Sequence, residues 1–200
     1  LSGQEEDTGM SGEITGGRYR IIDRDNSFKP AVFNRVMTFN RGDVYSLDAQ
    51  NTSLSRIMNL GNFKFVKNSF EPAGDSLLDV YYRLTPYPVK SLRFEAGANT
   101  QNDNRAGTKG SISWKHRNAF RGAEEFVFKI NGGFEAQYSG PVRQPAIYNF
   151  GAETNLSFPR FVVPFISFYT PSQYLPRSTV RLRYNFESSA KLINISSYTA

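Results

Sequence analysis

The sequence predicts an α+β module followed by an all-β region, in the order strand, helix, helix, strand, strand and then five or six antiparallel strands. Three observations lead to this fold class. The chain has 17 Phe and 11 Tyr among 200 residues, and aromatic side chains favour strands. Apolar residues recur at helical spacing between residues 30 and 60. Beyond residue 88 the helical spacing disappears, and apolar and polar residues alternate as they do in strands.

The same patterns divide the chain into three parts. Residues 1–17 are rich in Gly, Ser and Glu and contain no apolar signal-peptide core, so we expect a flexible N-terminal tail. Residues 18–87 carry the mixed pattern and residues 88–200 the alternating one. The predicted boundary follows Pro86, where the helical periodicity has ended.

The module is expected to begin with a strand at residues 19–23 and a helix that starts at Pro30. A proline suits the first helical turn because the N–H that it lacks has no partner there. The spacing of the following apolar residues builds one stripe on this helix. The stripe consists of Val32, Phe33, Val36 and Met37.

A second helix is predicted after Ser46, whose hydroxyl suits an N-cap, and it should end before Gly61, which suits the left-handed position after a helix. Strands are then expected at residues 63–70 and 78–84, joined by a turn at residues 71–75. The apolar residues that we expect on one face of the second helix are Leu47, Leu54, Ile57 and Met58.

The alternating half predicts strands that cross a membrane. Most of the runs approach the roughly 9–11 residues that a tilted strand needs to span a bilayer, and these exceed the usual strand length of about 5–6 residues. Their apolar face would meet lipid and their charged or small face a wet lumen. A soluble β-sandwich gives the same alternation and stays open as an alternative. The runs lie at residues 92–100, 111–115, 125–135, 148–158 and 180–187, with a possible sixth at 191–197.

Several short motifs carry a resemblance to a known family. The turn Gly42-Asp43-x-Tyr45, followed after a helix by Leu60-Gly61-x-Phe63, resembles a polypeptide-transport-associated (POTRA) domain. Such β-α-α-β-β modules precede the barrel in the BamA/TamA outer-membrane assembly family. The segment Asn118-x-Phe120-x-Gly122-x-Glu124 resembles the short periplasmic turn that follows the second barrel strand of that family. Together the likeness covers roughly residues 19 to 187.

The chain also departs from the family pattern. The family's barrel has sixteen strands, and five or six runs do not close one. The Val-Arg-Gly-Phe loop motif and the aromatic C-terminal residue of the family are both absent from this sequence. The resemblance therefore predicts a POTRA-like module followed by the first five or six strands of an incomplete transmembrane β-barrel.

The resemblance implies a function in inserting or translocating other proteins at the outer membrane of a Gram-negative bacterium, with the module in the periplasm. Implied partners are unfolded outer-membrane proteins or a secreted client, periplasmic or lipoprotein subunits of an assembly complex, and the lipid bilayer. Two strand edges would receive client strands. In the module the expected edge residues are Phe63, Phe65, Val66 and Phe70. In the barrel the expected lateral-gate residues are Leu92, Phe94, Glu95, Ala96, Gly97, Ala98 and Asn99.

Two other functions stay open at this point. One is a secretion pore of the same superfamily that exports a dedicated partner through its lumen. The other is a non-transporting surface or structural β-protein that binds a protein partner through its aromatic faces.

Enzymatic, cofactor-dependent and nucleic-acid-binding functions are not expected. The net charge is +6, but the basic residues are spread along the chain and alternate with aromatic ones rather than forming a patch. There is no Cys, and His116 is the single His, so neither a thiolate site nor a His-based metal site is predicted. The paired glycines at 132–133 lack the Lys of a phosphate-binding loop. The sequence also lacks the 18-residue apolar run of a transmembrane helix.

Overall fold

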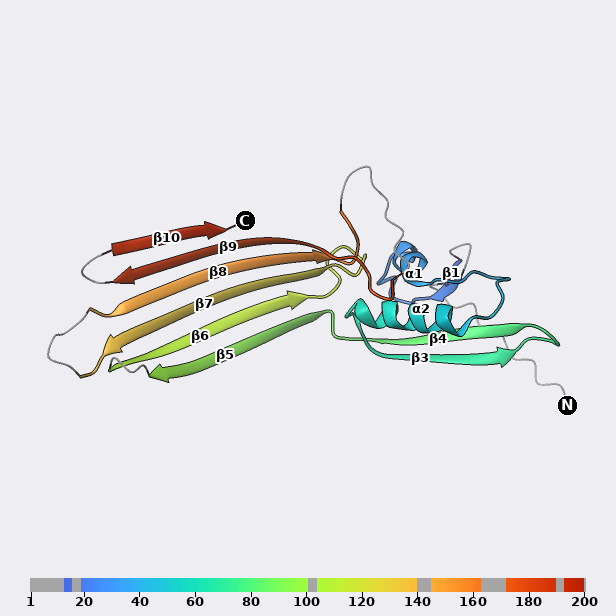
Figure 1. The fold of residues 1–200 in the computed structure, drawn as a ribbon, viewed down its shortest axis with the longest axis horizontal. Coiled ribbons are helices and arrows are strands. Elements are labelled where there is room, and N and C mark those ends of the chain that lie inside the picture. Colours follow the sequence, from blue (N-terminus) through green and yellow to red (C-terminus); the bar gives the residue numbers. More distant parts are fainter. Residues whose placement is uncertain are drawn as a thin grey trace. The chain divides into compact units, whose positions relative to one another are not determined.

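Among the residues that it describes, the computed structural model contains two helices and three antiparallel sheets (Figure 1). Neither helix in the described part of the chain is long and apolar enough to cross a membrane. The described residues are 13–15, 19–100, 104–139, 145–162, 172–189 and 193–199.

The chain divides into two compact units, which we call the mixed unit and the sheet unit. The mixed unit contains both helices and also takes in two segments from far along the sequence. It comprises Leu1–Tyr87, Phe120–Ala123 and Val163–Pro176. The sheet unit comprises Pro88–Ala119, Glu124–Val162 and Arg177–Ala200.

The first strands of the mixed unit form a short hairpin. β1 (Glu13–Thr15) pairs antiparallel with β2 (Arg20–Ile22). β2 is the strand predicted at residues 19–23, and it pairs with β1 because an extended segment needs a partner for its backbone N–H and C=O groups. The predicted flexible tail at residues 1–17 therefore contains a strand, while its remaining residues lie outside the described part of the chain.

Helix α1 (Pro30–Val36) starts where the sequence predicted it, with the proline in the first turn. It ends at Met37, whose backbone N–H still donates to the carbonyl of Phe33 at 3.0 Å. Val32 and Val36 are fully buried, and Phe33 and Met37 pack beside them. The predicted apolar stripe is confirmed.

Both predicted ends of helix α2 (Leu47–Asn59) are confirmed. The hydroxyl of Ser46 accepts a hydrogen bond from the backbone N–H of Ala49 at 3.4 Å. Gly61, just past the helix, has a φ of 73°, in the left-handed region that suits glycine.

The apolar face predicted for α2 is confirmed only in part, because Ile57 is buried and the other three predicted residues are not. Leu47 and Met58 are 58% and 60% exposed, whereas Ser53, Arg56 and Ile57 are buried. Polar residues occupy the inner face because each has a partner there. The Ser53 hydroxyl accepts from the backbone N–H of Thr38 at 3.0 Å and donates to the Ala49 carbonyl at 2.8 Å. Arg56 donates from two guanidinium nitrogens to the Ser172 carbonyl, at 3.0 and 2.7 Å.

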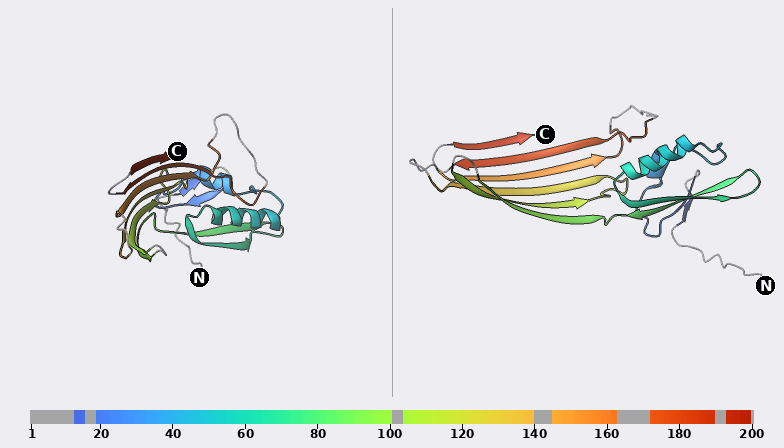
Figure 2. Two further views of the ribbon diagram at one scale, coloured as in Figure 1. Left: turned by 60° about the vertical axis from the view of Figure 1, so that its left-hand side comes forward. Right: turned by 60° about the horizontal axis from the view of Figure 1, so that its bottom comes forward.

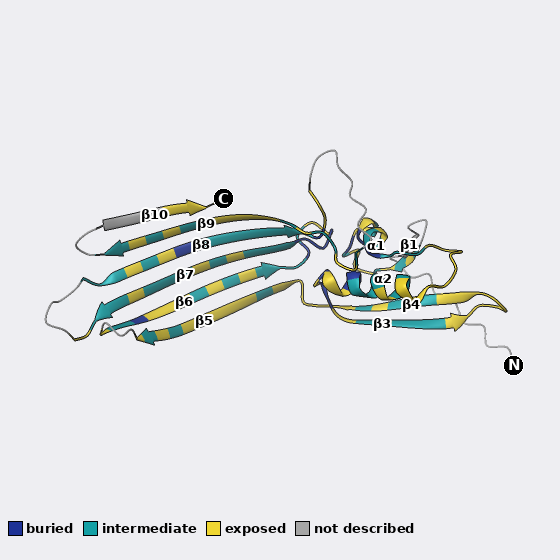
Figure 3. Ribbon diagram, viewed as in Figure 1, coloured by how far each residue is buried: buried dark blue, intermediate teal, exposed yellow. Residues whose placement is uncertain are grey.

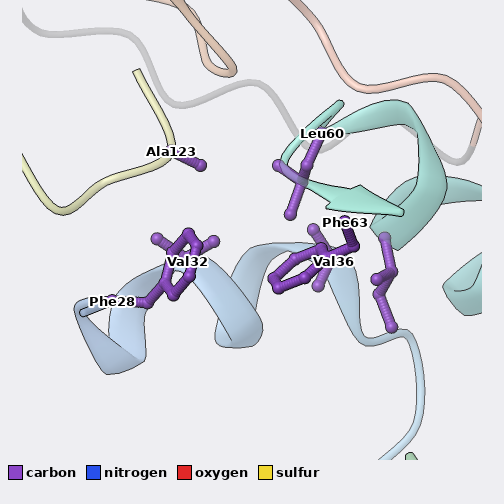
Figure 4. Close-up of a cluster of buried hydrophobic side chains, with 7 residues drawn as sticks. Phe28, Val32, Val36, Leu60, Phe63 and Ala123 are labelled. Carbon is purple, nitrogen blue, oxygen red and sulfur yellow. The ribbon is translucent and has the colours of Figure 1, made fainter. Parts of the chain in front are cut away.

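Strands β3 (Phe63–Pro72) and β4 (Leu78–Pro86) form the predicted antiparallel hairpin, with an irregularity between Phe63 and Phe65. Val66, Tyr82 and Leu84 on one face pack against the apolar core of the mixed unit. Figure 4 shows this core, to which the Phe120–Ala123 segment contributes Ala123. The buried core residues are Phe28, Val32, Val36, Ile57, Leu60, Phe63 and Ala123.

The sheet unit is a six-stranded antiparallel sheet in which each strand pairs with its neighbours along the sequence. The sheet is curved across its strands (Figure 2). The expectation of five or six strands is met with six. They are β5 (Lys90–Thr100), β6 (Arg105–His116), β7 (Glu125–Gln137), β8 (Ile147–Phe158), β9 (Ser178–Ser189) and β10 (Ile193–Thr199).

The strand register places residues of one kind in the same cross-strand row. One row contains Phe94, Ile112, Ile130, Ala152 and Tyr184. The adjacent row, on the opposite face, contains Arg93, Ser113, Lys129, Glu153 and Arg183. We call these two sides the apolar face and the polar face.

Among its described residues, neither face of the sheet carries a layer of buried side chains. In strands β5 to β9 the only buried residues are Gly107 and Gly151, which have no side chain to bury (Figure 3). A sheet of a water-soluble domain normally buries one face against another layer. Within the described residues, the sheet unit itself contributes no such layer over its apolar face.

Candidate functional site

The predicted gate strand lies at an edge of the six-stranded sheet. Among the described strands β5 pairs only with β6, and β10 pairs only with β9. Half of the backbone N–H and C=O groups of β5 therefore point away from its one partner. Such an edge is a template to which another strand adds.

In the second half of β5, the side chains on the apolar face are small, and so are their partners on β6. Ala96 lies opposite Gly110, and Ala98 lies opposite Thr108. Cross-strand pairs of large or charged residues stabilise a sheet by roughly 0.2–1 kcal/mol each relative to Ala pairs, and these positions lack that contribution. The contact of this end of β5 with β6 rests mainly on backbone hydrogen bonds.

The first half of β5 carries larger side chains on both faces. On the apolar face Phe94 is 69% exposed. On the polar face the carboxylate of Glu95 accepts from the Ser111 hydroxyl at 3.1 Å and lies 3.6 Å from the Lys129 ammonium on β7. Asn99, near the end of the strand, donates to the Glu135 carboxylate at 3.4 Å. These exposed polar contacts are individually weak.

The polar face carries a network of charges around a shallow hollow of about 590 Å³. Its best-connected member is Glu153, which lies 2.7 Å from Arg183 and 3.6 Å from Arg181. Asn155 donates to Glu153 at 2.7 Å and accepts from Arg181 at 2.7 Å. Acidic and basic groups thus alternate across neighbouring strands, as suits a wet surface.

Large side chains on the apolar face are exposed. Aromatic pairs mark both ends of this face. Trp114 lies 5.8 Å from Phe126 near one end, and Phe134 lies 5.1 Å from Tyr148 near the other. On strands β5 to β9 the exposed set is Leu92, Phe94, Ile112, Trp114, Phe128, Ile130, Phe134, Tyr148, Phe150, Val180 and Leu182.

The predicted edge residues of the mixed unit divide between its core and its surface. Phe63 is buried in the core, Val66 packs against it, and the ring of Phe70 lies edge-on to Tyr45 at 5.7 Å. Phe65 alone among the four is exposed, at 60%, with the Lys64 ammonium 5.2 Å from its ring centre. β3 pairs only with β4 among the described strands. Any strand that adds to β3 would thus meet its backbone edge and Phe65.

The motif residues of the mixed unit hold turns. Gly42 has a φ of 90°, and the Asp43 carboxylate beside it accepts from the backbone N–H of Asn40 at 2.7 Å. The Tyr45 hydroxyl donates to the Gln50 side chain at 2.6 Å. Gly61 ends α2, as described above. These positions stabilise local backbone structure.

The Asn118–Glu124 segment is a constrained turn. Asn118 and Glu124 are buried, and Phe120 is exposed. The backbone N–H of Ala119 donates to the Glu124 carbonyl at 3.0 Å. Arg121 and Ala123, on either side of Gly122, have φ values of 64° and 63°, which non-glycine residues adopt at a cost.

Sequence reasoning missed that Phe120–Ala123 and Ser172–Pro176 belong to the mixed unit. The Arg121 carbonyl accepts from the backbone N–H of Lys29 at 2.7 Å, and Leu175 packs against the core. Arg56 holds the Ser172 carbonyl across 116 positions of sequence. No signal in the local sequence predicts this contact, because the burial of Arg56 is seen only in the structure.

The chain has no match among known families: no family model fits it, and no curated protein matches its sequence.

Within the described residues no group of His, Asp and Glu side chains is placed to hold a metal ion. His116 lies beside Trp114, with ring centres 5.9 Å apart, and its Nδ1 accepts from the backbone N–H of Asn118 at 3.3 Å.

Proposed function

We propose that this chain belongs to an outer-membrane protein assembly or translocation factor, in which β5 to β10 are part of a transmembrane β-barrel. The observation that carries this proposal is the pair of chemically opposite faces of the sheet. An exposed apolar patch of this extent on a protein marks a surface that meets lipid or another protein.

The apolar face has the chemistry of a lipid contact. Strands β5 to β9 contain 11 to 13 residues each, which suffices to cross a bilayer at the tilt of a barrel strand. Aromatic residues flank both ends of the face, where membrane barrels carry their aromatic girdles. A β-sandwich would instead need a second layer, and the described residues of the sheet unit contain none.

The polar face has the chemistry of a wet interior. Its side chains pair with one another in a hollow on the side opposite the apolar face. A bilayer does not solvate such charges, and bulk water would not require them to be confined to one face. A water-filled lumen accounts for both faces at once.

The edge of β5 is the proposed gate at which client strands pair. Its small residues give weak side-chain contact with β6, so little is lost when the strand shifts. Phe65 and the edge of β3 form a second proposed receiving site in the mixed unit, which we propose to be a POTRA-like module. The unpaired backbone groups supply affinity without requiring a particular client sequence.

Disulfide trapping tests the gate directly, because the chain contains no native Cys. We expect Glu95→Cys and Asn99→Cys variants to form disulfides with a Cys-bearing terminal strand of an unfolded outer-membrane protein. Ser113→Cys is the matched control, since it lies on the same face but in β6, which is paired on both sides. Equal trapping at all three positions, or none at β5 in a folded protein, would remove the gate from the proposal.

A further inference from the structure

We propose that the polar hollow binds extended polypeptide through three side-chain amides, those of Asn131, Asn149 and Asn185. This inference rests on the proposed function, because it requires a client segment to enter the interior that the polar face lines. The inference adds a second contact site for the client, separate from the edge of β5. The ligand of this second site is the backbone amide groups of the client.

The three amides lie on neighbouring strands of the sheet. Asn131 is on β7, Asn149 on β8 and Asn185 on β9. Asn131 and Asn185 flank Gly151 in one cross-strand row, and Asn149 lies opposite Gly133 in the next row. All three line the hollow of about 590 Å³.

Glycines make room for these side chains. A Cβ on Gly133 would lie 2.6 Å from the Asn149 Oδ1. A Cβ on Gly151 would lie 2.7 Å from the Asn131 Oδ1 and 2.9 Å from the Asn185 Oδ1. No real Cβ tolerates such distances, so the glycines allow the amides to lie low over the sheet. Gly132 lies on the opposite face, and a Cβ on Gly132 would have no neighbouring atom closer than 3.7 Å.

The side-chain amides of these three residues are accessible from the hollow, and none of the three residues is buried. Within the described residues none of the three amides makes a hydrogen bond, although each carries two N–H donors and a carbonyl acceptor. Asn155 provides the contrast, because it lies on the same strand and face as Asn149 and its amide bonds both Glu153 and Arg181. The ammonium of Lys109, which also lines the hollow, likewise has no ion pair within the described part of the chain.

A peptide backbone is the ligand that this chemistry fits best. Each peptide group offers one N–H donor and one C=O acceptor. The carbonyl and N–H groups of a side-chain carboxamide can bond to both of them. Bases and sugars usually stack on aromatic side chains, and the polar face of β5 to β9 carries none. The hollow mixes both signs of charge, with Lys109 and Lys129 beside Glu135 and Glu153, so it does not select an anion.

The test measures binding of a labelled peptide to the full chain refolded in detergent micelles. The probe is a 16-residue peptide of Gly, Ser and Thr, followed by fluorescence anisotropy. We expect the double variant Asn149→Ala, Asn185→Ala to weaken binding about tenfold, since a net hydrogen bond accounts for roughly a three- to tenfold change in affinity. Gly133→Ala should also weaken binding, because its Cβ displaces the Asn149 amide.

Two matched variants serve as controls. Gly132→Ala changes the neighbouring glycine on the other face, and Asn155→Ala removes an amide that is already bonded within the protein. Both should bind the peptide as the parent chain does. The same peptide with N-methylated backbone nitrogens should bind the parent chain weakly, and this comparison involves no variant that could misfold.

Three results would overturn the inference. They are unchanged affinity in the double variant, equal affinity for the N-methylated peptide, and binding of a maltooligosaccharide in preference to the peptide. The disulfide test at β5 remains independent of these. If client strands are trapped at β5 but the amide variants have no effect on peptide binding, only this inference is removed. If peptide binding depends on the amides but no strand is trapped at β5, the proposed gate is removed.

Discussion

At the scale of single residues, Tyr82 of β4 has an unusual environment. Its ring stacks with Phe39 at 6.3 Å, and its buried hydroxyl has no hydrogen-bond partner among the described residues. Burial, and the nearby Tyr45, raise the pKa of the Tyr82 phenol above its ordinary value. The neutral phenol is thus favoured in the folded mixed unit.

The pH dependence of stability follows from this shift. As pH rises past the unfolded pKa of about 10, the unfolded chain loses the Tyr82 proton first, so the free energy of unfolding falls. We expect Tyr82→Phe to reduce that alkaline loss of stability. At neutral pH the same variant should be as stable as the parent or more so, because it removes an unsatisfied hydroxyl. Urea denaturation at pH 7 and pH 10.5 measures both effects; marked destabilisation at pH 7 would contradict the account.

Adjacent residues on β6 test the assignment of the two faces. Ile112 is on the apolar face and Ser111 on the polar face, where it contacts Glu95. In a lipid-spanning strand we expect Ile112→Lys to destabilise the protein by about 2–4 kcal/mol, and Ser111→Lys to change its stability little. Urea titration of both variants refolded in lipid vesicles gives the comparison. Similar costs at the two positions would contradict a lipid-facing apolar side.

At the scale of elements, the N-cap of α2 is the local contribution to stability that is easiest to isolate. The Ser46 hydroxyl accepts from Ala49 at 3.4 Å, near the long limit for a hydrogen bond. Ser46→Ala should therefore lower the free energy of unfolding of the mixed unit by roughly 0.5–1 kcal/mol, the lower part of the range for N-caps. Ser46→Asp should restore it. Thermal denaturation followed by circular dichroism measures both, and equal loss in the two variants would argue against capping.

Local patterns predicted the elements well. Proline at the start of α1, Ser46 and Gly61 at the ends of α2, and the alternation in β5 to β9 are each determined by residues close in sequence. The polar part of the buried face of α2 was not predictable in this way. Its inner residues depend on Thr38 and on Ser172, and no local periodicity encodes a carbonyl 116 positions away.

The candidate site was also predicted only in part. Alternation placed the residues of β5 on their correct faces, but it gave no reason to expect that Phe63, Val66 and Phe70 would be used in packing the mixed unit. The amides of the polar hollow were likewise missed. Their grouping depends on the register of three strands, which turns and loops set and which the sequence of one strand does not specify.

At the scale of the whole molecule, the proposed function depends on the environment of the apolar face. Edge pairing at β5, a wet polar hollow and the amide site all follow if that face contacts lipid. A protein layer over the same face would instead support a soluble β-structure that binds a partner.

Trp114 provides the most direct test, because it is the single Trp of the chain and lies on the apolar face. Its fluorescence in refolded vesicles therefore reports on that face alone, with no labelling. We predict that lipids brominated on their acyl chains quench Trp114 strongly, while aqueous iodide does not. Strong quenching by iodide together with none by brominated lipid would contradict the lipid-facing assignment and the proposed function with it.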